Sequence, residues 1–315
     1  MSLTVGIDIG GTKIASGLVD EAGNVVQSDR LATPSRNPES VENAIVELVL
    51  EYRSEHDVEA VGIGCAGFID EKRSRVLLAP NLGWADEPLR LAIESIVKIP
   101  VVVENDANAA AWGEYKFGGG QGSADMICVT VGTGIGGGFV FDGSLYRGAH
   151  GFAAEIGHMS VEPGGRLCAC GNRGCWEQYA SGNALVRDAR RLASDRRAEA
   201  EVLLDLGDGT PEGVQGKHIT QAARLGDPVA LAAFAELAHW LGLGMANVAA
   251  LLDPGCFIIG GGVSEAGDLL LGPTRQSFLT ELSGRENRPV LPQIALASLG
   301  NAAGLVGAAD LARYR

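Results

Sequence analysis

The chain is short of positive charge. Its 315 residues include 25 lysines and arginines against 39 aspartates and glutamates, which gives a formal net charge of −14. Nucleic acids and anionic membrane surfaces are bound by protein faces rich in lysine and arginine. The composition therefore argues against both kinds of partner.

The sequence also leads us to expect neither a secretory leader nor a membrane span. Its start, MSLTVGIDIGG, has no basic stretch followed by an apolar run and a cleavage site. The longest apolar window, residues 231–252, is interrupted by Glu236, His239 and Asn247. We therefore expect a buried helix there rather than a membrane span.

A disulfide framework is missing as well. Three of the six cysteines, Cys65, Cys128 and Cys256, each lie alone in an apolar, strand-like run, which is typical of core packing. Because no evenly spaced set of cysteines is present, a reducing compartment suits the chain. We expect a cytoplasmic protein.

The other three cysteines lie in one short run, EIGHMSVEPGGRLCACGNRGCWE, which begins at Glu155 and ends at Glu177. One histidine nitrogen and three sulfurs can complete a tetrahedral shell, which is the pattern of a structural zinc site. A few buried thiols beside a surface histidine are the alternative, which the close spacing of the cysteines between glycines disfavours. The spacing matches neither a zinc ribbon nor a zinc finger. The candidate ligands are His158, Cys168, Cys170 and Cys175.

No linker rich in proline or charge divides the chain, and its length and 46% apolar content are sufficient for two domains with a sizeable core. The first sixty residues predict a strand, a hairpin, a strand and then a helix over residues 39–51, just after Pro38. Two further strands, AVGIGCAG and PVVVEND, precede a helix that Asp106 or Asn108 opens.

The middle of the chain repeats the pattern of its start. VGIDIGGTKIASGLVDEAG and ICVTVGTGIGGGFVFDGS share a β run, a glycine loop, another β run and a turn. This similarity predicts an internal duplication, and chance similarity of glycine-rich hairpins is the alternative. Farther on, Asp227 and Pro228 predict the start of a helix that ends at Leu252, and residues 300–315 predict a final helix.

Three glycine loops follow apolar strands, at residues 8–13 (DIGGTK), 132–138 (GTGIGGG) and 260–262. Glycine lets the backbone approach a ligand and point its N–H groups at an anion, so these loops predict phosphate binding. In so acidic a chain a divalent cation would offset the repulsion of a nucleotide, and Asp8 is the candidate carboxylate for Mg²⁺. The alternative is three tight hairpins, with Lys13 simply solvated.

Two familiar nucleotide motifs do not fit. The sequence contains no G-x-x-x-x-G-K-[ST] loop. Gly132, Gly134 and Gly137 satisfy G-x-G-x-x-G, but the following GFVFDGSLYRG predicts a strand and a turn where a dinucleotide site needs a helix. A Rossmann oxidoreductase is therefore a weak alternative.

The segment Glu104-Asn105-Asp106 ends the strand PVVV, and α/β proteins tend to place functional side chains at strand ends. Asp106, with Asn105 beside it, is suited to take a proton from a substrate hydroxyl that attacks phosphorus. Capping of the following helix is the alternative role, since Asp and Asn both cap well. Both roles are compatible if Asn108 caps the helix while Asp106 faces a cleft.

Together these motifs resemble those of the ROK kinases (repressor, open reading frame, kinase), and among them the bacterial ATP-dependent glucokinases. DIGGTK at 8–13 and GTGIGGG at 132–138 resemble the family's two phosphate motifs, and ENDANAAAWGE at 104–114 resembles its catalytic segment. EIGH at 155–158 with CACGNRGCWE at 168–177 resembles the family's zinc and sugar signature, which is the most specific of the four. The resemblance runs nearly end to end.

The resemblance implies an α/β protein with the actin-like ATPase (ribonuclease H-like) fold, in which two α/β domains surround a central cleft. Residues 1–106 would form the small domain, completed by the C-terminal helix at about residues 301–315. Residues 107–300 would form the large domain, with a zinc-binding loop at 155–177. Because DIGGTK begins at residue 8, we expect no helix-turn-helix of the kind that the family's repressors carry at their N-terminus.

The resemblance also implies roles for individual residues. Asp106 is implied as the general base on the sugar 6-hydroxyl, and His158 as a ligand of both zinc and sugar. The residues implied to bind the sugar are Gly67, Asn105, Asp106, Glu155, His158 and Glu177. The residues implied to bind ATP and its Mg²⁺ are Asp8, Gly10, Gly11, Thr12, Lys13, Thr133, Gly134, Gly261 and Gly262.

The implied function is phosphorylation of glucose by ATP at the 6-hydroxyl, with ATP, Mg²⁺ and a structural Zn²⁺ as cofactors. AAAWGE after ENDAN resembles glucokinases more than N-acetylhexosamine kinases. Kinases for mannose, N-acetylmannosamine or N-acetylglucosamine are alternatives, and a sugar-sensing regulator is the alternative outside enzymes. A polyphosphate donor is disfavoured because such relatives typically lack the cysteine cluster. The family is usually dimeric or tetrameric, so we expect a homo-oligomer that acts in glycolysis.

Overall fold

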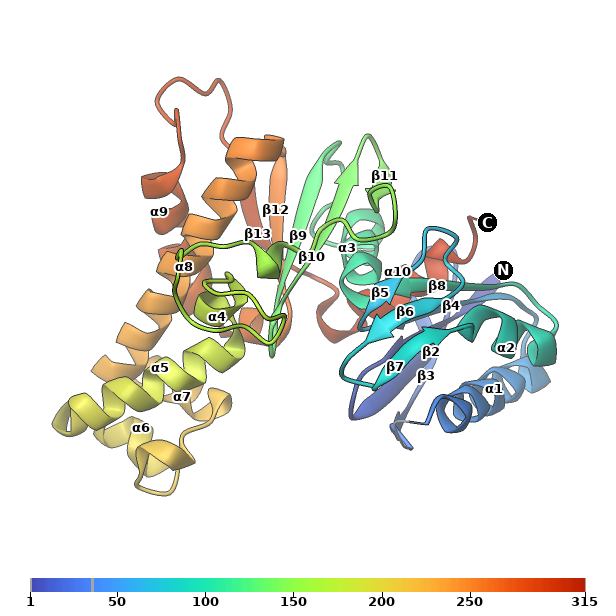
Figure 1. Cartoon of the computed structure of the whole chain (residues 1–315), viewed down its shortest axis with the longest axis horizontal. Helices are drawn as coiled ribbons and strands as arrows, with labels where there is room; N and C mark the ends of the chain where they lie inside the picture. The colour runs from blue at the N-terminus through green and yellow to red at the C-terminus, as the bar shows by residue number, and fades with distance from the viewer. Residues whose placement is uncertain (1, 35–36, 315) are drawn as a thin grey trace. The chain divides into compact units, whose positions relative to one another are not determined.

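The computed structural model describes residues 2–34 and 37–314 (Figure 1). Contacts within the chain define two compact units, and each is described by itself. Unit 1 consists of Met1–Cys128, Gly137–Ala154 and Ser298–Arg315, and unit 2 of Val129–Gly136 and Glu155–Ala297. The domain boundary predicted at residue 106 stays a prediction.

Unit 1 is built on a five-stranded sheet. Its strands are β1 (Leu3–Ile9), β2 (Lys13–Val19), β3 (Val25–Ala32), β4 (Val58–Cys65) and β8 (Val101–Asn105). Their order is β3-β2-β1-β4-β8, in which β2 is antiparallel to β1 and β3, while β4 is parallel to β1 and β8. The antiparallel pairing of β2 and β3 confirms the hairpin predicted at the start of the chain. A smaller antiparallel sheet contains β5 (Phe68–Ile69), β6 (Val76–Ala79) and β7 (Trp84–Glu87).

The helices of unit 1 cover both faces of its large sheet (Figure 1). They are α1 (Pro38–Glu55), α2 (Leu89–Val97), α3 (Asp106–Phe117), α10 (Ala303–Leu311) and the 3-10 turn η5 (Gly300–Ala302). α1 and α2 bury the face on which Val5, Ile7 and Ile9 lie. α10 packs directly on the opposite face, where a Cβ on Gly6 would lie 2.1 Å from the carbonyl oxygen of Leu305.

The second sheet repeats the plan of the first. Its strands are β9 (Met126–Val131), β10 (Ile135–Phe141), β11 (Ser144–Tyr146), β12 (Cys256–Gly260) and β13 (Gln293–Leu296). Their order is β11-β10-β9-β12-β13, with β10 antiparallel to β11 and β12 parallel to β13. The two sheets thus share one order of strands, which confirms the predicted internal duplication. After the glycine loop that begins at Gly132, the chain continues as the strand β10, whereas a dinucleotide site would need a helix there.

The remaining helices belong to unit 2. They are α4 (Glu177–Ala180), α5 (Gly182–Asp195), α6 (Glu201–Leu206), α7 (Gly216–Arg224), α8 (Pro228–Leu252) and α9 (Asp268–Glu281), with 3-10 turns η1 (Ile156–His158), η2 (Arg197–Glu199), η3 (Pro211–Gly213) and η4 (Gly262–Ala266). α8 begins as predicted, because the Asp227 carboxylate accepts the backbone N–H groups of Val229 and Ala230.

α8 also tests the prediction of a buried apolar helix. Within the described part of the chain it is the one helix long and apolar enough to cross a membrane. However, 61% of its most apolar window is buried inside the structure. This burial is typical of a core helix, and the polar residues that interrupt its sequence agree with that interpretation.

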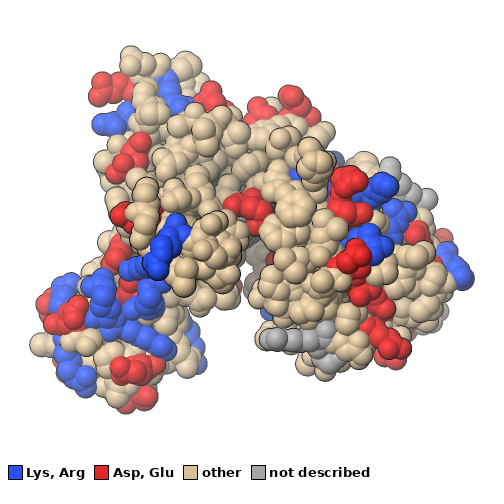
Figure 2. All heavy atoms as spheres, viewed as in Figure 1, with Lys and Arg blue, Asp and Glu red and all other residues tan. Residues whose placement is uncertain are grey.

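Charged side chains of both signs share the face drawn in Figure 2. The largest group of basic side chains on this face lies where Figure 1 draws α5 and α6. Arginines of α5 are paired with carboxylates: Arg187 with Asp188 at 2.9 Å and Arg191 with Asp195 at 3.5 Å. These contacts neutralise part of the positive charge of the group.

Candidate active site and metal centre

The predicted general base lies at a junction of strand and helix. β8 ends at Asn105 and α3 begins at Asp106. The side-chain oxygen of Asn105 accepts the backbone N–H of Asn108 at 3.0 Å, so Asn105 is the cap of α3. The alternatives in which Asp106 or Asn108 caps the helix are therefore wrong. Asp106 opens the first turn of the helix, as predicted.

Asp106 and Asp8 lie close to one another in unit 1. A Cβ on Gly304, in the first turn of α10, would lie 3.8 Å from Asp8 Oδ2 and 3.9 Å from the backbone oxygen of Asp106. Burial raises the pKa of Asp106 above its ordinary value. Burial, and next the charge of Asp106, raise the pKa of Asp8 to about 6, while Lys13 acts in the opposite direction. The strand ends thus bring together two acidic groups of raised pKa.

The first glycine loop is the tight turn between β1 and β2. The backbone N–H of Gly10 donates to the Lys13 carbonyl at 2.9 Å, and Thr33 Oγ1 donates to the Gly10 carbonyl at 2.8 Å. Gly11, Thr12 and Lys13 are exposed. The turn therefore presents a hydroxyl and an ammonium group to solvent, which suits a phosphate, although its hairpin geometry also fits the simpler alternative.

Gly67 is held against Asn105. Its carbonyl accepts the side-chain N–H of Asn105 at 3.1 Å. A Cβ at Gly67 would lie 2.5 Å from the carbonyl oxygen of Leu78, so only glycine allows this approach. Three of the predicted sugar ligands, Gly67, Asn105 and Asp106, are therefore neighbours in unit 1.

The four predicted metal ligands meet in unit 2. One donor atom each from His158, Cys168, Cys170 and Cys175 lies within 4.8 Å of all the others. His158 Nδ1 is 3.7 Å from Cys168 Sγ, and Cys170 Sγ is 3.6 Å from Cys175 Sγ. Zinc–sulfur bonds of about 2.3 Å in a tetrahedron separate two ligands by about 3.8 Å. The donor set therefore fits Zn²⁺ in both chemistry and spacing.

The loop that carries these ligands has little regular structure. It contains the 3-10 turn η1 and isolated β-bridges, one of them between Ser160 and Cys175. Gly174 has a φ of 79°, and a Cβ there would lie 1.9 Å from a carbonyl oxygen of the same loop. Trp176 anchors the end of the loop on α8, because its buried indole donates to the Trp240 carbonyl at 2.7 Å. Sequence reasoning gave Trp176 no role, although it directly follows a cysteine of the motif.

Glu177 is in contact with the second glycine loop. Glu177 Oε2 accepts the backbone N–H of Ile135 at 3.1 Å, and a Cβ at Gly134 would lie 2.0 Å from the same oxygen. Gly157 packs on the Ile135 carbonyl: a Cβ at Gly157 would lie 2.2 Å from that carbonyl oxygen. A predicted sugar ligand and a predicted phosphate ligand are therefore neighbours. Sequence reasoning missed Ile135, because a backbone N–H group leaves no sequence signal.

The other predicted residues of unit 2 are more open. Glu155 and Thr133 are exposed, and His158 is half-buried. Gly261 follows β12 with a φ of 82°, and a Cβ there would lie 2.6 Å from a carbonyl oxygen at the end of β9. This turn therefore requires glycine. A Cβ at Gly262 would meet no atom within 4 Å, so a ligand has room to approach.

The predicted site residues thus divide between the two units. Unit 1 contains Asp8, Gly10, Gly11, Thr12, Lys13, Gly67, Asn105 and Asp106. Unit 2 contains Thr133, Gly134, Glu155, His158, Cys168, Cys170, Cys175, Glu177, Gly261 and Gly262.

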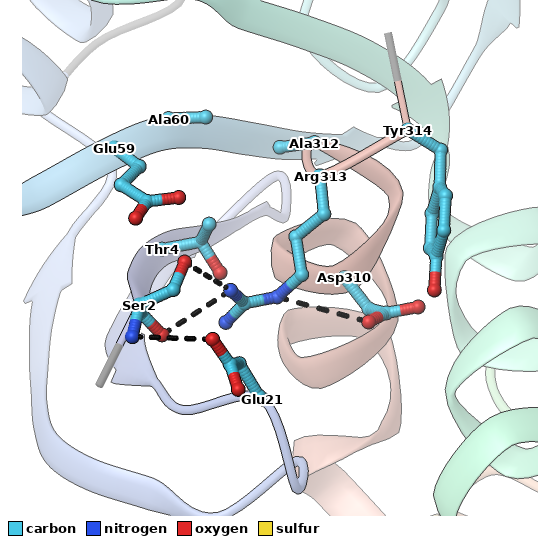
Figure 3. Close-up of a pocket in the computed structure, with 9 residues that line it drawn as sticks. All are labelled: Ser2, Thr4, Glu21, Glu59, Ala60, Asp310, Ala312, Arg313 and Tyr314. Atoms are coloured by element: carbon cyan, nitrogen blue, oxygen red, sulfur yellow. Dashed lines mark hydrogen bonds and ion pairs between the residues drawn. The ribbon is translucent and has the colours of Figure 1, made fainter.

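A pocket of about 290 Å³ lies in another part of unit 1 (Figure 3). Its walls come from both ends of the chain: Arg313 donates to Ser2 Oγ at 2.9 Å and lies 3.8 Å from Asp310. Glu21 and Glu59 add two further carboxylates to its lining. The predicted site residues are not among the described residues that line it, so this pocket is separate from the candidate site.

Comparison with known proteins gives a consistent result. The model of the ROK family matches residues 4–315. The chain is 56% identical to a glucokinase from Streptomyces coelicolor, over 99% of this chain and 98% of that protein. It is similar to the crystal structure of a ROK family glucokinase from Streptomyces griseus in complex with glucose and AMPPNP, with a TM-score of 0.91, 56% identity and 100% coverage of both chains. A xylose repressor from Bacillus subtilis is 31% identical over 90% of this chain and 69% of the repressor.

Proposed function

We propose that this chain, which belongs to the ROK family, transfers the γ-phosphoryl group of ATP to the 6-hydroxyl of glucose. The observation that carries the proposal is its end-to-end similarity, at 56% identity, to glucokinases, one of which is described with glucose and AMPPNP. The fold is accordingly that of the actin-like ATPase type of sugar kinase, and the shared strand order of its two sheets agrees.

Asp106 is the proposed general base on the attacking hydroxyl. Burial raises its pKa above the ordinary value of an aspartate, which makes the carboxylate a stronger proton acceptor. Its place in the first turn of α3 fixes the backbone from which the carboxylate projects. Asn105 and Gly67 beside it offer amide and carbonyl groups to the sugar hydroxyls. Phosphoryl transfer then depends mainly on positioning and on charge stabilisation.

The three glycine turns are the proposed ATP-binding elements. Thr12 and Lys13 contribute a hydroxyl and an ammonium group to the phosphates, and Gly261 lies by the adenosine. Asp8 is the proposed carboxylate for Mg²⁺, because above a pH of about 6 it is ionised, which is the form that binds a hard cation. Bound Mg²⁺ supplies the positive charge that offsets the phosphates.

The cysteine cluster is the proposed site of a structural Zn²⁺. Because Nδ1 of His158 lies beside Cys168 Sγ, the other ring nitrogen is left for a sugar hydroxyl. The ligands thus orient the histidine ring as sugar binding requires. Glu155 and Glu177 are the proposed carboxylate acceptors for the remaining hydroxyls.

An ADP-release assay with ATP tests the activity across glucose, mannose, N-acetylmannosamine and N-acetylglucosamine. We expect the highest kcat/KM with glucose. A higher value with another of these sugars would correct the substrate, because a site that pairs with each hydroxyl of its sugar disfavours one in which the 2-hydroxyl is inverted or replaced by an acetamido group. Absence of turnover with every sugar would contradict the kinase and favour a sugar-sensing regulator.

We further propose that the protein is a dimer or tetramer of the cytoplasm, where its product enters glycolysis. The support for this is the resemblance to the ROK kinases. Light scattering of the purified protein tests the assembly, and a monomeric mass at micromolar concentration would contradict it.

A further inference from the structure

Glu104 is a buried carboxylate and the first residue of the catalytic segment at 104–114. It is 1% exposed, and its Oε1 accepts the backbone N–H of Asn105 at 2.9 Å. The same oxygen accepts the side-chain amide of Asn108 at 3.1 Å. Glu104 therefore fixes both the residue that ends β8 and the first turn of α3. A buried carboxylate is costly unless positive charge compensates it.

Two arginines supply that compensation. The Nε atoms of Arg73 and Arg147 lie 3.1 Å and 2.9 Å from Glu104 Oε2. Arg147 does more than balance charge, because its other nitrogens donate to the carbonyls of Asp70 at 2.8 Å and Glu71 at 3.0 Å. The planar guanidinium holds these directions rigidly. One side chain, only 10% exposed, thus joins the β8–α3 junction to the turn after β5.

The residues after Arg147 dock on the same turn. Gly151 has a φ of 83°, and a Cβ there would lie 2.1 Å from the Ile69 carbonyl oxygen. Phe152 stacks on Phe68, with ring centroids 4.7 Å apart and an interplanar angle of 21°. Phe68 directly follows Gly67, whose carbonyl binds the Asn105 side chain. Residues 147–152 therefore contact the supports of Asn105 on two sides, at Glu104 and beside Gly67.

We propose that Arg147 is a positioning residue of the sugar site. It acts through Glu104 on the backbone of Asn105, and through the turn after β5 on Gly67, so that both face the sugar in one fixed arrangement. The inference rests on the proposed function, since it treats Asn105, Asp106 and Gly67 as sugar-facing groups. A purely stabilising ion pair would instead affect the fold and leave the balance between the substrates unchanged.

The test is Arg147→Met, which removes the guanidinium and keeps an unbranched stem. We expect the KM for glucose to rise about tenfold or more and kcat to fall, while the KM for ATP stays within about twofold. Arg75→Met is the matched control. Arg75 lies near the same small sheet, and its side chain bonds Asp86 at 2.8 Å, but both of these side chains are exposed. Wild-type values for both KM constants are expected in the control.

Two further variants define the route of the effect. Arg147→Lys keeps a charge near Glu104 without the planar fork, so it should recover part of the glucose KM. In the double variant Arg147→Met with Glu104→Gln, the loss in kcat/KM should not exceed the larger single loss, because both changes act on one contact. Additive losses would exclude the route through Glu104.

Equal glucose KM values in Arg147→Met and Arg75→Met would overturn the proposal, as would a parallel rise in both substrate KM values. If the wild-type protein turns over no hexose, the proposed function fails on its own. The positioning role is then judged by amide hydrogen exchange at Asn105 and Asn108. Faster exchange there in Arg147→Met than in Arg75→Met supports it, and unchanged exchange contradicts it.

Discussion

The residues proposed to bind the sugar come from two regions that are built in different ways. In unit 1, Asn105 and Asp106 lie where the parallel strand β8, paired with β4 along its whole length, meets the helix α3, so regular backbone hydrogen bonds help to fix them. In unit 2, Glu155 and His158 belong to a loop with one short 3-10 turn and isolated bridges. The first region therefore depends on secondary structure, whereas the second depends on glycine turns, Trp176 and the four clustered metal ligands.

Because of this difference, the substitution of a single side chain should have different consequences in the two regions. The side chain of Asp106, which opens α3 without capping it, can be changed without changing the backbone that carries it. A ligand of the cluster cannot, because a bound structural metal contributes directly to the folding of the segment that holds it. A change of Asp106 should therefore alter one chemical step, whereas changes at the cluster should alter the shape of a binding surface.

The largest expected effect is that of Asp106→Asn. Asparagine keeps the size of the side chain but cannot accept the proton, so kcat should fall about 10²–10⁴-fold, or about 3–5 kcal/mol. Zinc content and the glucose Kd from calorimetry should stay at wild-type values, because the backbone junction is kept. Asp57→Asn, an exposed carboxylate of the same unit, is the control. A variant with wild-type kcat would remove Asp106 from the mechanism.

Cys170→Ser should have the next largest effect, which should fall on glucose binding rather than on the chemical step. Serine is a poor zinc ligand, so the variant should lose zinc, and kcat/KM for glucose should fall about 100-fold, mainly through KM. Zinc is measured by atomic absorption alongside the kinetics. Ala169→Ser adds a hydroxyl to the neighbouring exposed position and should change neither value. An active Cys170→Ser protein free of zinc would show that the loop keeps its shape without the metal.

Gly134→Ala tests the contact between Glu177 and the glycine loop. The new methyl would lie 2.0 Å from Glu177 Oε2, so the carboxylate must leave the Ile135 N–H. Loss of a charged hydrogen bond is worth about 1.5 kcal/mol or more, which corresponds to a rise of about tenfold in the glucose KM. A Cβ at Gly132 meets no atom within 4 Å, so Gly132→Ala should leave the glucose KM unchanged. Similar glucose KM values in both variants would contradict a role of this contact.

Sequence patterns predicted the regular region better than the contacts that hold it. β1, β2, α3 and α8 follow from apolar runs, alanine content and the Asp227 cap, all of which are local signals. The cap of α3 was predicted wrongly, because Asn105, Asp106 and Asn108 are all good caps. Which of them caps depends on where the strand pairing of β8 stops, and that is a tertiary property.

The metal cluster was predictable because its ligands lie close together in sequence. The contacts around it were not, since Glu177 and Ile135 are 42 positions apart and the donor is a backbone group. Arg147 and Glu104 are 43 positions apart, and a lone arginine after a turn carries no local signal. The sequence therefore indicates which residues carry out the chemistry more clearly than it indicates which residues hold them in position.

The smallest expected effect concerns stability and is confined to unit 1. In the protein without ligands, the pKa of Asp8 is about 6, against an ordinary value of 3.8. The folded state therefore binds this proton more tightly than the unfolded chain, and its stability falls as pH rises from about 4 to 6. Above pH 6 the full destabilisation is present, about 1 kcal/mol once the partial exposure of the residue is allowed for.

Asp8→Asn cannot ionise, so it should be more stable than the wild type at pH 7.5 and equal to it near pH 4. Urea unfolding at the two pH values measures this difference, with Asp57→Asn again as the control. Zinc content should not change, because Asp8 and the metal ligands belong to different units. A stability difference of the same size at both pH values would contradict this explanation. It would show that the altered side chain, and not the loss of an ionised carboxylate, causes the difference between the variant and the wild type.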